Sequence, residues 1–300
     1  MKTKTIICAI VLLLGCANLL NSQELLDILK QEQKDSARYV TPAFKMTRIA
    51  FGHSTEVRAK GVLEFFTATR FWNFPGDRSE SFVADKVTTR IALEYGITDR
   101  LSFGVGGTTF DGLFDGYLKY RLVSQGKGQK TNPFNITLFQ GASYNSSSGS
   151  IYSNNASISS DRFAYTTQVL ISRKFSKKFS FQVTPTFVHK SLGLNASDNK
   201  NFVAIGFGAR YKIGPHMSLV SEYYRTLNPV ESFDTFDPFA IGVNWEVGDI
   251  LIQLMLTNTR NMVEDTFITQ TRNNFNFKDP NLHFGFNATY VIHFNNKLKN

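Results

Sequence analysis

The sequence predicts an all-β fold: a single antiparallel transmembrane β-barrel of about 12 strands with a short N-terminal periplasmic segment. Three observations support this fold class. Apolar and polar residues alternate in segment after segment, short and long connections between these segments alternate along the chain, and beyond the N-terminus no apolar run approaches the roughly 20 residues of a membrane-spanning helix.

The alternation is clearest in residues 84–110. Side chains on a strand point to opposite faces with a period of two, so one face is apolar and the other polar. The apolar face of the first half carries Val87, Thr89, Ile91, Leu93 and Tyr95. After a short connection at Gly96–Asp99, Leu101, Phe103 and Val105 resume the pattern. This stretch is expected to form a hairpin with one wall in lipid. The glycines of Gly104–Gly107 therefore lie in a strand, where they indicate close backbone packing or barrel curvature rather than a phosphate loop.

Segments of this kind recur to the C-terminus, and each has about the 9–11 residues of a tilted membrane strand. We expect strands at 57–71, 84–95, 100–109, 115–124, 133–144, 163–174, 179–189, 201–213, 217–226, 238–247, 250–258 and 283–294. The count is about 12, with about 14 as the alternative, because boundaries read from one sequence shift by roughly 2–4 residues.

The connections fall into two classes. Tight ones at 97–99, 176–178, 214–216 and 248–249 alternate with long polar ones at 73–83, 145–162, 190–200, 228–237 and 259–282. Outer-membrane barrels have short periplasmic turns and longer outer loops, whereas a sandwich has no reason to lengthen every second connection. The exceptions are a long turn at 125–132 and a short outer loop at 110–114.

The N-terminus predicts export. Lys2 and Lys4 precede an apolar run from Ile6 to Leu14 and a polar cleavage zone ending at Gln23. We assign 1–23 to a signal peptide, 24–55 to an N-terminal periplasmic extension and 56–300 to the barrel. Within 24–55, residues 44–51 are compatible with either a strand or a plug. A lipoprotein signal acylated at Cys16 is the alternative to ordinary cleavage.

Composition excludes several classes of function. Cys8 and Cys16 both lie in the signal, so the exported chain has no disulfide, thiol nucleophile or zinc–thiolate site. Loss of Lys2 and Lys4 lowers the formal net charge from +9 to +7. The basic residues are scattered and form no run, which argues against a nucleic-acid partner. The histidines lack metal-ligand spacing, and we expect no cofactor and no metal.

Two further runs suggest a family. Residues 44–49 (FKMTRI) and 52–56 (GHSTE), together with 94–101 (EYGITDRL) and 115–121 (DGYLKYR), resemble an uncharacterised family of porin-like outer-membrane β-barrels from Bacteroidota, a domain of unknown function. The resemblance covers nearly the whole exported chain. It implies one barrel in the bacterial outer membrane, and it implies neither a substrate nor functional residues.

The inward wall is the candidate functional surface. Strand parity predicts that its pore-lining residues include Lys60, Glu64, Lys86, Arg90, Glu94, Lys119, Arg121, Arg210, Glu222, Asn244 and Glu246. A barrel of about 12 strands lies between those filled by side chains and those with a wide channel, so a narrow pore and a plugged lumen both stay open. An excess of inward bases predicts a positive lumen.

We therefore expect a passive narrow channel for small polar or anionic solutes in the bacterial outer membrane. A closed structural or assembly-partner barrel is the alternative. The expected partners are outer-membrane lipid, the barrel-assembly machinery and a small anionic solute. Catalysis is not expected: His189 and Ser191 resemble the His-x-Ser pair of outer-membrane phospholipase, but Val203 stands where its third residue would be.

Overall fold

The computed structural model describes residues 38–39, 42–72, 84–109, 112–127, 131–146, 159–193, 195, 198–275 and 282–294. The chain divides into two compact units. In the smaller one (Met1–Val40 with Gln125–Pro133), the short strands β1 (Arg38–Tyr39) and β6 (Gly126–Lys127) pair antiparallel. The larger one (Thr41–Ser124 with Phe134–Asn300) holds the barrel. The predicted signal peptide lies outside the described residues.

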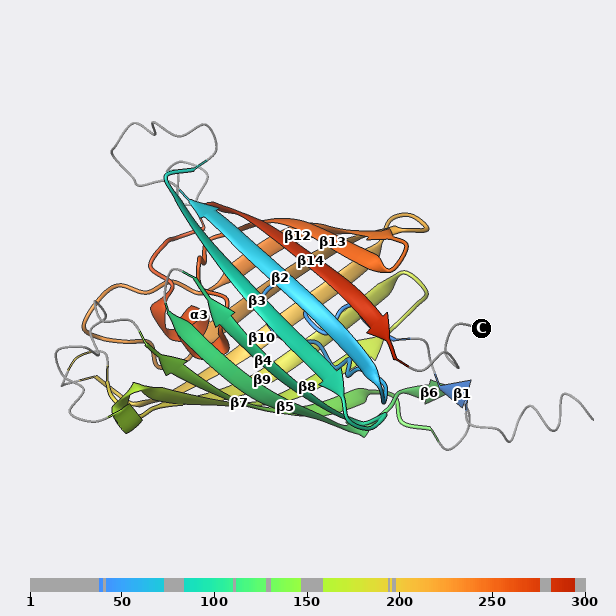
Figure 1. Ribbon diagram of the computed structural model, residues 1–300, viewed down its shortest axis with the longest axis horizontal. Helices are drawn as coiled ribbons and strands as arrows, with labels where there is room; N and C mark the ends of the chain where they lie inside the picture. The colour runs from blue at the N-terminus through green and yellow to red at the C-terminus, as the bar shows by residue number, and fades with distance from the viewer. Residues whose placement is uncertain are drawn as a thin grey trace, which may run out of the picture. The chain divides into compact units, whose positions relative to one another are not determined.

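The larger unit is a closed antiparallel barrel of twelve strands (Figure 1). The strands are β2 (Val62–Trp72), β3 (Lys86–Gly96), β4 (Leu101–Thr108), β5 (Leu113–Val123), β7 (Asn135–Asn145), β8 (Phe163–Lys174), β9 (Phe179–Lys190), β10 (Asn201–Lys212), β11 (Met217–Thr226), β12 (Phe239–Val247), β13 (Ile250–Thr257) and β14 (His283–His293). Each strand pairs with its neighbours in the chain, and β14 closes the ring on β2. Closure leaves no unpaired strand edge in the membrane, where unsatisfied backbone groups would be costly.

The fold class and the strand count are confirmed. The largest error in the strand boundaries is the start of the first strand, expected at 57 and observed at Val62. Residues 57–61 do not join the sheet because they lead from the lumen to the wall, and Gly61 turns the chain there with a φ of 76°.

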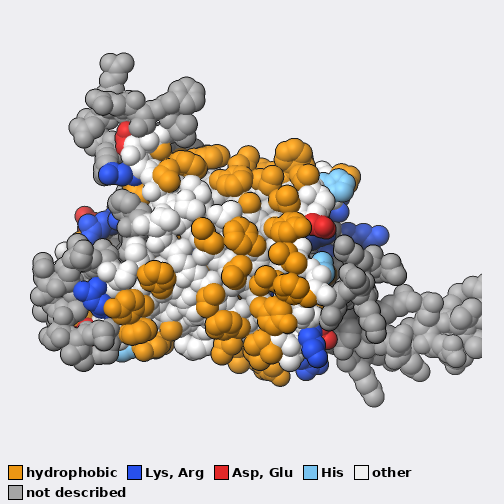
Figure 2. Space-filling model, viewed as in Figure 1, with side chains coloured by type: hydrophobic (Ala, Val, Ile, Leu, Met, Phe, Trp, Pro, Cys, Tyr) orange, Lys and Arg blue, Asp and Glu red, His pale blue; other side chains and the backbone are white. Residues whose placement is uncertain are grey.

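The two walls differ in chemistry. The outward side chains are the large hydrophobic ones, such as Ile91, Leu93 and Val105, and they cover the outer face of the barrel (Figure 2). Charged side chains appear at the two ends in this view (Figure 2). The inward side chains of β3, such as Thr88, Arg90 and Glu94, are buried. This is the arrangement of a barrel with lipid outside. No helix among the described residues is long and apolar enough to span a membrane.

The tight turns lie at one end of the barrel, here called the short-turn end (Figure 1). The other end, where the strands that precede the long connections stop, is called the long-loop end. The turn between β12 and β13 contains only Gly248 and Asp249, and Gly248 has a φ of +60° that glycine adopts without strain. The described parts of the long loops include a 3-10 turn, η1 (Ser159–Arg162), and a helix, α3 (Glu264–Gln270).

The lumen is occupied. Residues 42–58, here called the plug, form hydrogen bonds with inward side chains around the circumference: Glu64, Lys119, Thr137, Ser172, Gln182, Glu222, Gln253 and Asn287. The plug appears as a blue segment inside the barrel in Figure 1. The expected periplasmic extension over 24–55 is therefore wrong for residues 42–55, because their polar backbone binds the polar wall. Of the two forms left open for 44–51, the plug is the one observed.

The last long loop also differs from expectation. Residues 259–282 were expected to be a polar outer loop, yet α3 is buried over Glu264–Thr269 and contacts β8, β9 and β11. Two segments far apart in the chain thus fill the lumen together.

Candidate functional site: the plugged lumen

The plug folds back on itself as a short hairpin. Arg48 and His53 form an antiparallel bridge, and the backbone N–H of Ile49 donates to the carbonyl of Gly52 at 2.9 Å. Next to this bridge, the N–H of Ser54 donates to the Thr47 carbonyl at 2.8 Å. The tip, Ala50–Gly52, is buried in the lumen. A hairpin of this size has few internal hydrogen bonds, so its remaining backbone groups need partners on the wall.

One wall carboxylate binds the tip. Oε2 of Glu222 accepts the backbone N–H groups of Ala50, Phe51 and Gly52 at 2.9, 2.9 and 3.1 Å. Gly52 fits because a Cβ atom there would lie 2.4 Å from the Tyr224 hydroxyl oxygen and 2.5 Å from the Glu222 carboxylate. Charge-assisted bonds of this kind are about twice as strong as neutral ones. Glu222 is thus the anchor of the plug tip.

Amide side chains of the wall satisfy the carbonyl groups of the hairpin. Gln253 donates to the Ile49 carbonyl at 2.6 Å, Asn287 donates to the Ala50 carbonyl at 2.9 Å, and Gln182 donates to the His53 carbonyl at 2.8 Å. Gln253 also donates to Asn244 at 2.7 Å. These wall amides hold the backbone of the hairpin in one register.

The helix of the last long loop meets the plug tip. Arg48 lies 3.0 Å from Oε1 of Glu264, and the rings of Phe51 and Phe267 are 4.7 Å apart. α3 is itself tied to the wall: Asp265 accepts hydrogen bonds from Ser143 at 2.8 Å and from Lys190 at 3.0 Å. The plug and α3 therefore close the lumen jointly, through one ion pair and one aromatic contact.

Burial controls the charges at this junction. Burial lowers the pKa of His53 well below its usual value, and the cations Arg48, Lys119 and Arg90 lower it further. Burial also raises the pKa of the Glu264 carboxyl, although Arg48 opposes the rise. His53 is thus neutral at pH 7, packed against the rings of Tyr117 and Phe139 at centroid distances of 4.4 and 4.5 Å.

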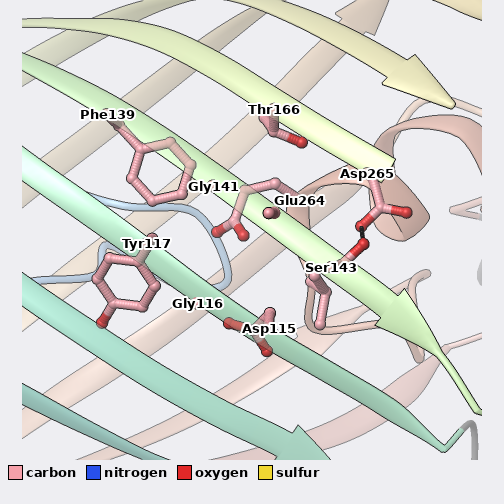
Figure 3. A pocket seen from close by; sticks show the side chains of 11 residues that line it. Asp115, Gly116, Tyr117, Phe139, Gly141, Ser143, Thr166, Glu264 and Asp265 are labelled. Carbon is pink, nitrogen blue, oxygen red and sulfur yellow. Dashed lines mark hydrogen bonds between the residues drawn. The ribbon is translucent and has the colours of Figure 1, made fainter. Parts of the chain in front are cut away.

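A small cavity lies beside this junction (Figure 3). Its volume of about 10 Å³ holds at most one water molecule. Its polar walls are Asp115, Ser143, Glu264 and Asp265, and the last two come from α3. Asp115 binds both terminal nitrogens of Arg90, so its charge is neutralised. Among the described residues no group of His, Cys, Asp and Glu side chains is arranged to hold a metal ion.

A family model described as "Membrane bound beta barrel domain (DUF5777)" matches residues 44–292. The chain belongs to this family. The matched range begins at Phe44, so the plug is part of the family domain together with the barrel. This agrees with the resemblance drawn from the sequence, and it makes the chain a membrane-bound β-barrel. No curated protein matches the chain.

Several solved outer-membrane proteins match this DUF5777 chain at low identity. The KdgM porin is 8% identical with a TM-score of 0.47, and the match covers 77% of this chain and 99% of that one. The NanC porin is 11% identical with a TM-score of 0.45, covering 77% and 98%. OmpT of Vibrio cholerae is 10% identical with a TM-score of 0.37, covering 79% and 99%. At these values the resemblance assigns neither a solute nor a site.

Most of the predicted pore-lining residues point inward. Glu64, Arg90, Glu94, Lys119, Arg210, Glu222 and Asn244 are all buried in the lumen. Several of them hold the plug rather than face an open pore. Lys119 donates to the carbonyls of Thr47 and Glu56, and Glu64 accepts from Thr47 at 2.6 Å.

The other four predicted residues are not buried in the lumen. Arg121 and Glu246 are partly exposed and pair with the plug residues Glu56 and Lys45 at 3.0 and 3.2 Å. Lys86 is the first residue of β3 and is exposed. Lys60 is not on the wall. It lies in the exposed turn before β2, because that strand starts later than its pattern suggests.

Sequence reasoning missed the residues that the plug and the loop contribute, namely Arg48, His53, Glu264 and Asp265. None of them belongs to an alternating segment, so strand parity could not assign them to the lumen. The only sequence signals were the plug alternative for 44–51 and the GHSTE motif. Lys190 was also missed as a lumen residue, and it binds Asp265.

The glycines of β4 and His189 of β9 were also singled out in the sequence. A Cβ atom at Gly104 would lie 2.2 Å from the Tyr117 ring, and one at Gly106 would lie 2.5 Å from the Arg90 guanidinium, so these two glycines of β4 make room for inward side chains. His189 lies on the outward side of β9, stacks on Tyr165 and contacts Asn201 at 2.7 Å.

Proposed function

We propose that this barrel is a passive channel for small polar or anionic solutes, and that its plug keeps it closed in the state described here. The observation that carries the proposal is the chemistry of the contact between plug and wall. The plug is held mainly by hydrogen bonds and ion pairs from side chains that water could equally well satisfy, such as Gln182, Glu222 and Gln253.

A permanently closed lumen would not need a polar wall. A buried ion pair or polar network is often no more stable than well-packed apolar residues of the same volume. A barrel that never opened would be stabilised by an apolar lumen. The inward wall is instead rich in Ser, Thr, Asn and Gln, including Thr88, Thr137, Gln168, Ser180 and Asn244. Such a wall supports water once the plug leaves.

A closed structural or assembly-partner barrel is the second candidate. It is favoured by the apolar contacts at the junction, where Phe51 packs against Phe267 and lies 5.9 Å from the Tyr224 ring. An apolar cluster has no role in a hydrated channel. The two candidates differ in whether the plug leaves the lumen at all.

The proposal also includes the export of the chain and its insertion into the membrane. We propose that the chain is exported by its N-terminal signal and inserted into the outer membrane by the barrel-assembly machinery, with outer-membrane lipid around its apolar face. The short turns would then face the periplasm.

The experiment is single-channel recording in planar bilayers with a plug that can be locked. A Cβ atom at Gly208 would lie 2.3 Å from Cδ1 of Ile49, so the double variant Ile49→Cys/Gly208→Cys brings two thiols together in a mature chain with no other cysteine. We expect openings when the disulfide is reduced and silence when it is oxidised. The single variant Ile49→Cys should not respond to oxidant.

A second variant shows whether a silent recording means that the plug is held too tightly to leave. Glu222→Ala removes the acceptor for three backbone N–H groups of the plug tip and should raise the open probability at least tenfold. If the wild type, the reduced double variant and Glu222→Ala are all folded and all silent, the channel proposal fails and the closed barrel is favoured.

A further inference from the structure

A larger cavity lies at the long-loop end, apart from the junction of plug and α3. It has a volume of about 190 Å³, room for several water molecules or one small solute. Its lining comes from the end of β2 (Trp72), the segment after β13 (residues 258–261), the segment from the end of α3 (residues 270–273) and the start of β14 (His283). Trp72 and His283 are inward residues of neighbouring strands, so the cavity opens into the barrel mouth and not toward lipid.

The charged side chains that line this cavity are positive. It contains Arg260 and Arg272, the amides of Asn258, Asn261, Gln270 and Asn273, and the hydroxyls of Thr259 and Thr271. No carboxylate is among these lining residues. Arginine presents several N–H donors in a planar fork that suits a carboxylate or a phosphate. An anionic solute would match this lining better than a neutral or cationic one.

The framework of the cavity is held by its own hydrogen bonds. Asn258 accepts from the backbone N–H of Phe239 at 2.8 Å and donates to the carbonyls of Asp237 and Asn273, both at 2.9 Å. Thr271 donates to the Phe267 carbonyl at 2.7 Å. The walls are therefore preorganised, and binding need not order them first.

One buried polar atom in the lining lacks a partner. The amide nitrogen of Asn273 lies 2.7 Å from Nε2 of His283, which makes Nε2 the acceptor and leaves the proton of the neutral ring on Nδ1. That Nδ1 is buried and has no hydrogen-bond partner in the described part of the chain. Buried donors are rarely left unpaired, so an acceptor is expected next to this ring.

The two arginines lie against aromatic rings. The Arg272 guanidinium is 4.3 Å from the centre of the Phe233 ring, and the Arg260 guanidinium is 5.7 Å from that of Trp72. Stacking orients the planar group of Arg272, whose N–H donors lie along the edge of that plane. Within the described residues, Arg272 forms no ion pair.

We propose that this cavity binds one small anion, a free carboxylate or phosphate compound no larger than a monosaccharide acid. Arg272 binds its charge, and His283 and the neighbouring amides bind its remaining oxygens. The site lies where a solute entering from the long-loop end would first meet the closed lumen. The proposal does not depend on conduction, because a barrel that never opens would still bind the anion.

Tryptophan fluorescence tests the proposal in the full-length mature barrel in detergent. The chain has two tryptophans, and Trp245 lies on the outward face, so Trp245→Phe leaves Trp72 in the cavity as the only reporter. The probes are glucuronate and inorganic phosphate at constant ionic strength, with glucose as the neutral control of matched size. We expect a saturable change with glucuronate, phosphate or both, and none with glucose.

Matched variants locate the site. Arg272→Gln should weaken binding at least tenfold, and Arg272→Lys should recover part of it. Arg173→Gln, an arginine of β8 near the short-turn end, should leave binding unchanged. The proposal is overturned if neither anion gives a saturable change, if glucose gives the same change, or if Arg272→Gln binds as the parent does. Bilayer recordings of the same protein report separately on conduction.

Discussion

Arg48 of the plug and Glu264 of α3 lie 3.0 Å apart inside the barrel, although 216 residues separate them in the chain. Both side chains are at most 4% exposed. This ion pair joins the segment that precedes the barrel to the last long loop. The plug and α3 therefore close the lumen as one unit.

The first prediction concerns this pair. Removing one partner leaves a buried charge, which costs about 3–5 kcal/mol, whereas replacing both by apolar residues costs much less. Arg48→Met and Glu264→Leu should each loosen the plug, and the double variant should be closer to the wild type than either. Protease cleavage within the plug of the folded barrel measures this. Additive single effects would show that the two side chains act independently.

The second prediction concerns the outward wall. Ile91 lies in the middle of β3 and is exposed on the lipid side. Ile91→Arg should lower the free energy of unfolding by roughly 2–4 kcal/mol and impair assembly, because it places a charge near the membrane midplane. Ile97→Arg, the same change in a short turn, should cost about 0–1 kcal/mol. Urea unfolding in lipid vesicles compares them, and equal costs would contradict the assignment of this wall.

The third prediction concerns pH. Burial lowers the pKa of His53 in the docked plug, so neutral His53 stabilises docking above its undocked pKa of about 6.5, and this stabilisation is lost as the pH falls from there toward the lowered value. Glu264, which faces His53 from α3, acts in the opposite direction, because burial raises its pKa and protonation favours the docked form.

Burial and three cations all lower the pKa of His53, whereas Arg48 opposes the rise in the pKa of Glu264, so cleavage of the plug should increase between pH 6.5 and 5. His53→Phe should remove this increase. Glu264→Gln should make it steeper, because that variant keeps His53 and loses the opposing carboxyl. A wild-type plug that becomes more protected over this range would contradict the assignment.

The fourth prediction concerns charge selection in the open channel. The buried side chains of the wall include five bases, Arg70, Arg90, Lys119, Lys190 and Arg210, and four acids, Glu64, Glu94, Asp115 and Glu222. Arg70 is bound by the neutral groups of Asn287 and Thr69 rather than by a carboxylate. Its charge should therefore favour anions, and screening should weaken this preference in salt.

Arg70→Gln should reduce the anion preference without breaking an ion pair. The reversal potential in a salt gradient measures it. Arg90→Leu is not a neutral control, because it would leave the carboxylate of Asp115 without its bidentate partner. A conducting wild type that prefers cations at low salt would contradict the prediction.

The sequence by itself determined the barrel wall. The period of two assigned Leu93 to lipid and Glu94 to the lumen, and the alternation of tight and long connections gave the two ends and twelve strands. These are local properties, because the alternation can be read within each strand segment and the length of each connection can be read between neighbouring segments. The sequence also placed Glu222 and Lys119 inward, although not the partners that they bind.

Only the tertiary structure decided what fills the lumen. The hairpin at Arg48–His53 has no alternating pattern, and it acquires its hydrogen bonds from side chains on strands up to 237 residues away, such as that of Asn287. α3 has seven residues and no side-chain cap, so its burial depends on Asp265 reaching Ser143 and Lys190. Contacts across a barrel depend on which side chains closure of the ring brings face to face, and no periodicity along the chain encodes that.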